Sequence, residues 1–86
     1  MHESGLVRDL MGKVESELEG TTARVNRVRL RVGAMSGIDP AALREGARHY
    51  ALEDWGYVPE IEVETSTDPT DVNALGVLLV AIGVDG

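Results

Sequence analysis

The positions of apolar residues predict a helix near the start of the chain. Within Ser4–Glu19 an apolar residue recurs at every fourth position, which is the spacing of one face of an amphipathic helix. These residues are Leu6, Leu10, Val14 and Leu18. Charged and polar side chains fill the opposite face, and Gly20 follows as a favourable helix stop. The segment is therefore expected to bury one side and to expose the other.

Two later segments alternate between apolar and charged residues, which is typical of half-buried strands. Within Arg24–Val32 the residues Val28, Leu30 and Val32 alternate with arginines, and within Glu60–Thr65 the residues Ile61 and Val63 alternate with glutamates. The charged rows are Arg27, Arg29 and Arg31 on one segment and Glu60, Glu62 and Glu64 on the other. Opposite charges on neighbouring strands contribute about 0.2–1 kcal/mol per pair. The pattern therefore favours two strands that lie side by side.

A second helix is predicted between these strands, from Asp39 to about Asp54. Asp39 suits the N-cap because its carboxylate can accept a backbone N–H, and Pro40 suits the first helical position. The segment Trp55-Gly56-Tyr57 is expected to close this helix.

The segment Ala74–Val84 is apolar throughout and is predicted to be a third strand. Many of its residues are β-branched, and Gly76 and Gly83 disfavour a helix. A strand that is apolar on both faces needs cover on both faces. This need is the reason for expecting a homodimer as one arrangement of the protein.

The predicted order is α-β-α-β-β, and the predicted fold class is α+β, with two helices packed on one face of a three-stranded mixed β-sheet. A β-α-β crossover should make the strands Arg24–Val32 and Glu60–Thr65 parallel. The polar loop 66–73 then allows an antiparallel third strand. With 86 residues the chain is expected to form a single domain over residues 1–86.

The composition argues against several classes of function. The chain has no cysteine, so neither a disulfide framework nor a thiolate zinc site is expected. Its net charge of −7 repels phosphate backbones, so nucleic acid is not an expected partner. The acidic start is no signal peptide and no apolar run is long enough to span a bilayer, so a cytoplasmic protein without membrane contact is expected. An enzyme is the least favoured class because no nucleophile–base arrangement can be identified.

The first three residues carry the chemistry of a metal site. The Met1 amine and the His2 amide nitrogen can close a five-membered chelate ring, and the amide nitrogen and Nδ1 of His2 can close a six-membered one. The Glu3 amide nitrogen or carboxylate can supply a fourth donor. Four nearly planar nitrogen or oxygen donors suit Ni(II) or Cu(II) better than tetrahedral zinc. Two plain alternatives remain at this point, because histidine also occurs at position two by chance and chain ends are usually frayed.

The only other histidine, His49, is interpreted as an ordinary helix residue rather than as a ligand.

Three stretches of the chain together resemble the HypA/HybF family of nickel-insertion proteins. They are the start Met1-His2-Glu3, the strand–turn–helix segment 24–44 with its Gly33-Ala34-Met35-Ser36-Gly37 turn and Asp39-Pro40 helix start, and the strand Glu60-Ile61-Glu62-Val63-Glu64. The resemblance covers residues 1–65, which is most of the chain. The three-residue start alone is weakly specific, whereas its combination with the middle segment is strong.

The resemblance implies a nickel metallochaperone. It implies that Met1, His2 and Glu3 bind Ni(II), and that a HypB-like GTPase and the hydrogenase maturation machinery are partners in delivery to [NiFe] hydrogenase or urease. Family members also carry a zinc domain with two cysteine pairs. Here the loop 66–73 stands in its place and has no cysteine, so no zinc is expected. A degenerate relative and a natural minimal form both fit this departure, and a metal-free interaction or dimerisation module of the same fold is the alternative function.

Overall fold

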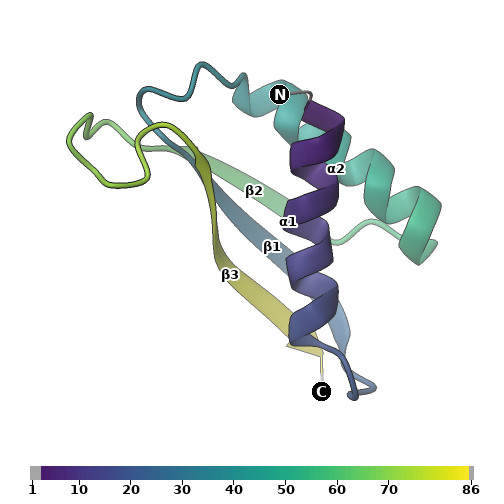
Figure 1. The fold of residues 1–86 in the computed structure, drawn as a ribbon. Helices are drawn as coiled ribbons and strands as arrows, with labels where there is room; N and C mark the ends of the chain where they lie inside the picture. Colours follow the sequence, from purple (N-terminus) through teal and green to yellow (C-terminus); the bar gives the residue numbers. More distant parts are fainter. Residues whose placement is uncertain (1–2, 86) are drawn as a thin grey trace.

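The computed structural model describes residues 3–85 and contains the five expected elements in the expected order. They are α1 (Glu3–Glu17), β1 (Arg24–Val32), α2 (Pro40–Trp55), β2 (Glu60–Thr65) and β3 (Val77–Asp85). Both helices cover one face of the sheet (Figure 1). The predicted α+β class is therefore confirmed.

The three strands form one mixed sheet in the order β2-β1-β3. The central strand β1 pairs in parallel with β2 and antiparallel with β3, as the connection lengths predict. The register places Arg27 opposite Glu60 and Arg31 opposite Glu64. The arginine row and the glutamate row therefore lie next to each other on the face that carries no helix.

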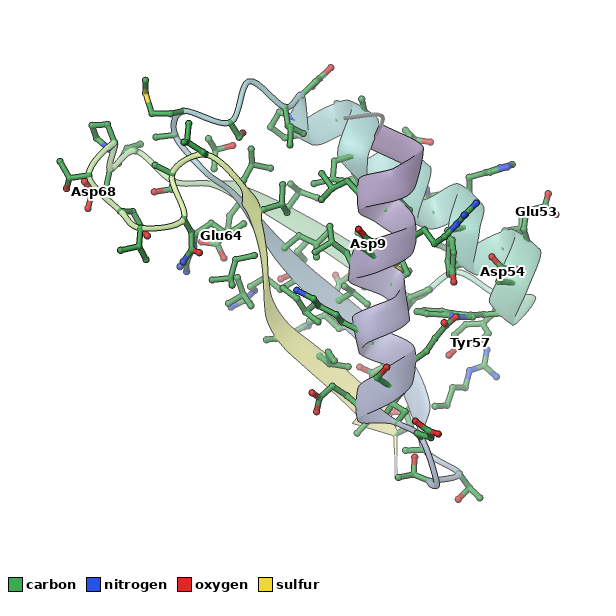
Figure 2. The ribbon with its side chains drawn as sticks, in the orientation of Figure 1. Asp9, Glu53, Asp54, Tyr57, Glu64 and Asp68 are labelled. Atoms are coloured by element: carbon green, nitrogen blue, oxygen red, sulfur yellow. The ribbon has the colours of Figure 1, made fainter. Side chains whose placement is uncertain are left out.

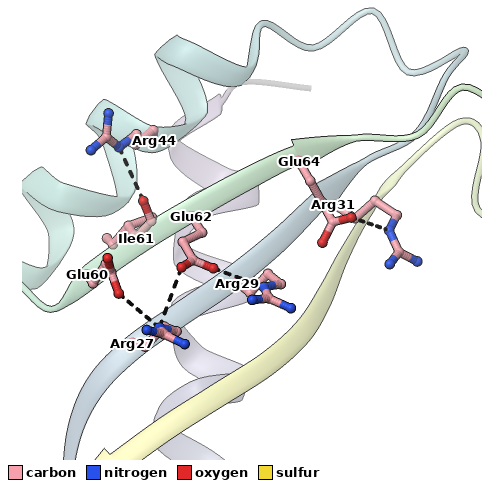
Figure 3. A network of polar contacts seen from close by, with 8 residues as sticks. All are labelled: Arg27, Arg29, Arg31, Arg44, Glu60, Ile61, Glu62 and Glu64. Atoms are coloured by element: carbon pink, nitrogen blue, oxygen red, sulfur yellow. Dashed lines mark hydrogen bonds and ion pairs between the residues drawn. The ribbon is translucent and has the colours of Figure 1, made fainter.

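Three arginines and three glutamates form a ladder of ion pairs across β1 and β2 (Figure 3). The Nε···Oε distances are 2.9 Å for Arg27–Glu60, 3.0 Å for Arg29–Glu62 and 3.3 Å for Arg31–Glu64. The hydrogen bond and the negative charge of Glu60 raise the pKa of Arg27 further above its usual range. Because all six side chains are open to solvent, the ladder sets register more than stability.

Local capping fixes both ends of α2. The Asp39 carboxylate accepts the N–H of Ala41 at 3.0 Å, and Pro40 occupies the first turn. At the other end Gly56 adopts a left-handed conformation with φ of 77°, and its N–H donates to the Ala51 carbonyl at 3.1 Å. These caps explain why the observed helix matches the predicted one to within a residue or two.

The core lies between the two helices and the sheet. Its largest fully buried side chains come from α1, β1 and α2, and they are Met11, Val14, Val28, Leu30, Val32 and Leu43. The helices approach closely at Gly46, where an added Cβ would lie 3.0 Å from Cγ2 of Val7. A larger residue at this position would push α1 and α2 apart.

The structure corrects the predicted start of the last strand. β3 begins at Val77, whereas Ala74–Val84 was the predicted range. The three preceding residues lie in turns because they are bonded to the chain after β1. The Gly33 N–H donates to the Gly76 carbonyl at 2.8 Å, and the Met35 N–H donates to the Ala74 carbonyl at 2.7 Å.

The first helix also ends earlier than predicted, at Glu17 rather than Glu19. The chain from residue 18 to residue 20 forms a turn that ends in Gly20, whose φ is 82°. The Thr21 hydroxyl donates to the Leu18 carbonyl at 2.8 Å and helps to close this turn. The stop residue was therefore correctly identified, but the helix itself ends before it.

Candidate functional site

The predicted nickel ligands lie at the amino-terminal end of α1. Met1 and His2 are outside the described residues, and Glu3 is the first residue of the helix, with only its backbone described. Because Glu3 is the first residue of α1 (Figure 1), a metal coordinated by residues 1–3 would be linked through the backbone to the start of this helix. The position of the site therefore depends on how firmly α1 is held.

Helix α1 is firmly anchored on the core. Its buried residues are Val7, Leu10, Met11 and Val14, none of them more than 4% exposed. Among the α1 residues whose burial is described, from Gly5 onward, Val7 is the first buried one, and it packs against Gly46 of α2. The second turn of α1 is therefore held beside the first half of α2.

An open groove runs between α1 and α2 on the outer side of the molecule. Its volume is about 610 Å³, and it is lined by Val7, Arg8, Ala42, Gly46, His49, Tyr50, Glu53 and Asp54. The acids Glu53 and Asp54 project from α2 (Figure 2). His49 is an exposed residue of this helix. Within residues 3–85 no three side chains of His, Cys, Asp or Glu come together in a way that could hold a metal ion.

A polar cluster that the sequence did not reveal joins the two helices at their far ends. The Tyr50 hydroxyl donates to the Glu15 carboxylate at 3.1 Å, and the Trp55 Nε1–H donates to the same carboxylate at 2.7 Å. The rings of Tyr50 and Trp55 meet edge to face, with centroids 6.3 Å apart. The spacing of the apolar residues places Glu15 on the polar face of the first helix and indicates no partner for it. The one available signal was the grouping of all aromatic residues within positions 50–57.

This cluster makes the ionisation of Tyr50 sensitive to Glu15. Burial, followed by the hydrogen bond and negative charge of Glu15, raises the pKa of Tyr50 above its usual value of about 10. The fold thus favours the neutral phenol. The contribution of the neutral Tyr50 phenol to stability is complete below the ordinary pKa of tyrosine. This contribution is lost as pH rises through the higher pKa that Tyr50 has in the folded protein.

Replacing Glu15 by glutamine should lower the pKa of Tyr50 part of the way towards its usual value. Only part of the shift should disappear, because burial remains when the charge is removed. The measurement is an alkaline titration followed by ultraviolet absorbance, in a Tyr57→Phe background so that one phenol is observed. Glu17→Gln, on the same helix, is the matched control and should leave the titration unchanged. An identical Tyr50 titration in the Glu15→Gln protein would contradict the role given to this carboxylate.

The loop between β2 and β3 is ordered by its own side chains. The Asp68 carboxylate accepts the N–H and the hydroxyl of Thr70 at 2.9 Å and 2.6 Å, and the hydroxyl bond in particular lowers the pKa of Asp68. The Asp71 carboxylate accepts the N–H of Asn73 at 2.8 Å. These are local turn bonds, and the loop leads the chain directly into β3.

No helix within residues 3–85 is both long and apolar enough to cross a bilayer.

Comparison with known proteins identifies the family. The family model described as hydrogenase/urease nickel incorporation, metallochaperone, hypA matches residues 1–72 of the 86-residue chain. No curated protein matches the chain, and no solved structure does so either. The matched range includes the Met-His-Glu start, both helices and the first two strands. The chain therefore belongs to the HypA family, whose members are metallochaperones that incorporate nickel during hydrogenase or urease maturation.

Proposed function

We propose that this protein binds Ni(II) at its amino terminus and passes it to a partner protein in the cytoplasm. Met1 would supply its amine, His2 its amide nitrogen and Nδ1, and Glu3 the fourth donor or an orienting group. The observation that carries the proposal is a nickel-incorporation family match that begins at residue 1, where the chain starts Met-His-Glu. A HypB-like GTPase is the proposed partner in delivery, and the protein acts as a carrier rather than as an enzyme.

The chemistry of the three residues supports nickel in particular. Adjacent donors close five- and six-membered rings and favour a flat arrangement, which suits Ni(II) and Cu(II). An unperturbed terminal amine has a pKa of about 7.7–8.0. Binding must displace the protons of the amine and of the amide, so nickel affinity should weaken as pH falls.

The anchoring of α1 supports a role in transfer. The proposed donors are consecutive residues at one end of a helix whose buried side chains begin at Val7. A partner could therefore take the metal without disturbing the core.

The nickel proposal is tested by calorimetry on untagged protein. We expect His2→Ala, and a chain whose Met1 amine is acetylated, each to weaken nickel binding at least tenfold, because the first change removes the His2 Nδ1 donor and the second removes the amine donor. His49→Ala is the matched control and should bind as the wild type does, since His49 lies on the exposed surface of α2. Equal affinity in all four proteins would refute the proposal.

We further propose that residues 1–86 act as one nickel domain in which the loop 66–73 replaces a zinc domain, and that zinc is not needed. The alternative function is a metal-free module for dimerisation or protein interaction. The apolar strand β3 favours this alternative, because its outer edge is unpaired in the described chain. A protein that dimerises but takes up no nickel would favour the module.

A further inference from the structure

The two edges of the sheet differ in how they are protected. At the β2 edge, Nε of Arg44 donates to the Ile61 carbonyl at 3.2 Å (Figure 3). Three glutamates on β2 add negative charge there. At the β3 edge, the run Val77–Val84 contains no charged residue and no proline. Within the part of the chain that the structure describes, no side chain bonds to the backbone of this run. Charge, proline, covering groups and β-bulges are the usual protections of an edge strand, and between Val77 and Val84 the described strand has only a bulge, at Val80.

The core-facing side of β3 is also incompletely covered. Its four core-facing residues lie opposite buried residues of β1; they are Val77, Leu79, Ile82 and Val84. The opposing β1 side chains are at most 4% exposed, whereas Val84 is 44% exposed and the other three are half-buried. An open groove of about 350 Å³ lies between Glu17 of α1 and residues 79–82. The helical layer therefore ends before it reaches the edge of the sheet.

We propose that the β3 edge is the surface through which two copies of this chain pair, antiparallel and across a two-fold axis, into one six-stranded sheet. Charge favours this edge over the other. Each chain carries a net charge of −7, and pairing through β2 would bring two rows of glutamate together. Pairing through β3 opposes no charged residues over Val77–Val84.

A bulge in β3 determines the register of this pairing. Arg29 lies opposite Ala81, but the next residue, Leu30, lies opposite Leu79, so Val80 is the extra residue. The core-facing positions are consequently odd-numbered before Val80 and even-numbered after it.

Core-facing side chains of the two β3 strands meet across the two-fold axis only when an odd-numbered position of one copy lies opposite an even-numbered position of the other. The register that pairs every core-facing residue places Val77 opposite Val84 of the second copy, and Leu79 opposite Ile82. Asp85 then lies opposite Gly76, so no carboxylates meet. A shift by one residue would set core-facing side chains against outward-facing ones.

Sedimentation velocity on untagged, nickel-free protein tests the surface. We expect the wild type to show a reversible monomer–dimer equilibrium. Ala81 is exposed and lies next to the proposed axis, so Ala81→Lys should raise the dimer dissociation constant at least tenfold by bringing two like charges together. Ala81→Glu should act in the same direction. Leu52→Lys is the matched control, because Leu52 is 57% exposed on α2, and it should leave the equilibrium unchanged.

Two results of this measurement would overturn the proposal. One is a wild type that stays monomeric at every concentration, and the other is a dimer that forms equally well in both Ala81 variants while their melting curves show a folded chain. Nickel is absent throughout, so failure of the nickel proposal would not affect the outcome.

The register is tested by disulfide formation, for which the cysteine-free chain gives no background. A mixture of Val77→Cys and Val84→Cys proteins should form a crosslinked heterodimer on mild oxidation, because directly opposed Cβ atoms come within reach of a disulfide. Val77→Cys alone should not crosslink, since its two copies would lie at opposite ends of the paired strands. Crosslinking of Val77→Cys with itself would overturn the register.

Discussion

Replacing Leu43 by alanine is expected to lower the free energy of unfolding by about 2–5 kcal/mol, measured by urea denaturation. Leu43 is fully buried on the inner face of α2, so the substitution removes apolar contacts and leaves a cavity between the helix and the sheet. A domain has only about 5–15 kcal/mol of stability in total, so this loss is a large share of it.

Leu52 provides the matched control for this prediction. It lies on the same helix but is 57% exposed, so Leu52→Ala should change the free energy of unfolding by no more than about 0.5 kcal/mol. Similar losses in the two variants would mean that α2 does not face the sheet as the structure shows. Nickel stoichiometry should be unchanged in folded Leu43→Ala protein, because the proposed donors are on residues 1–3.

The elements that sequence reasoning located best are those whose signals are local. β2, and β1 from Arg27 onward, follow the alternation seen in the sequence, because a charged residue at every second position cannot move to the buried face. Before Arg27 the alternation is broken by a bulge between Val25 and Arg27. The start of α2 follows from Asp39 and Pro40, which act within one turn of the backbone. The pairing of the arginine and glutamate rows also follows, since opposite charges favour one register.

The features that sequence reasoning missed depend on contacts between distant residues. The start of β3 is set by bonds from Gly33 and Met35 to the chain at Gly76 and Ala74, and periodicity carries no information about such bonds. The cluster of Glu15 with Tyr50 and Trp55 joins residues 35 and 40 positions apart.

The candidate site was identified in a different way from the fold. The prediction of Met1, His2 and Glu3 follows from the chemistry of a free chain start and from family resemblance. The structure of residues 3–85 shows that α1, which begins at Glu3, is anchored on the core. The family match supports the connection with nickel.

The close contact between the end of β1 and the loop that leads into β3 depends on one residue, Gly33. Gly33 is buried directly after β1, and a Cβ at this position would overlap the carbonyl oxygens of Asn73 and Ala74. These are backbone atoms, held by the bond from Gly33 to Gly76 and by the bond from Met35 to Ala74. Such neighbours cannot rotate away as a flexible side chain could. Any side chain at position 33 therefore has to separate the loop from the end of β1.

Gly33→Ala is accordingly expected to destabilise the protein by about 1–3 kcal/mol, the usual cost of overpacking a close contact. Gly12→Ala makes the same chemical change inside α1, where nothing lies within 4 Å of the added Cβ, and it should stabilise the protein by up to about 1 kcal/mol. The midpoint of urea denaturation should therefore fall for Gly33→Ala and rise for Gly12→Ala. Amide hydrogen exchange should quicken in β3 for Gly33→Ala but not in α1, because the contact joins the loop to β1 only. Equal stability of Gly33→Ala and wild type would show that the loop can separate from β1 without cost. The position of β3 in the sheet would then depend on its pairing with β1 alone.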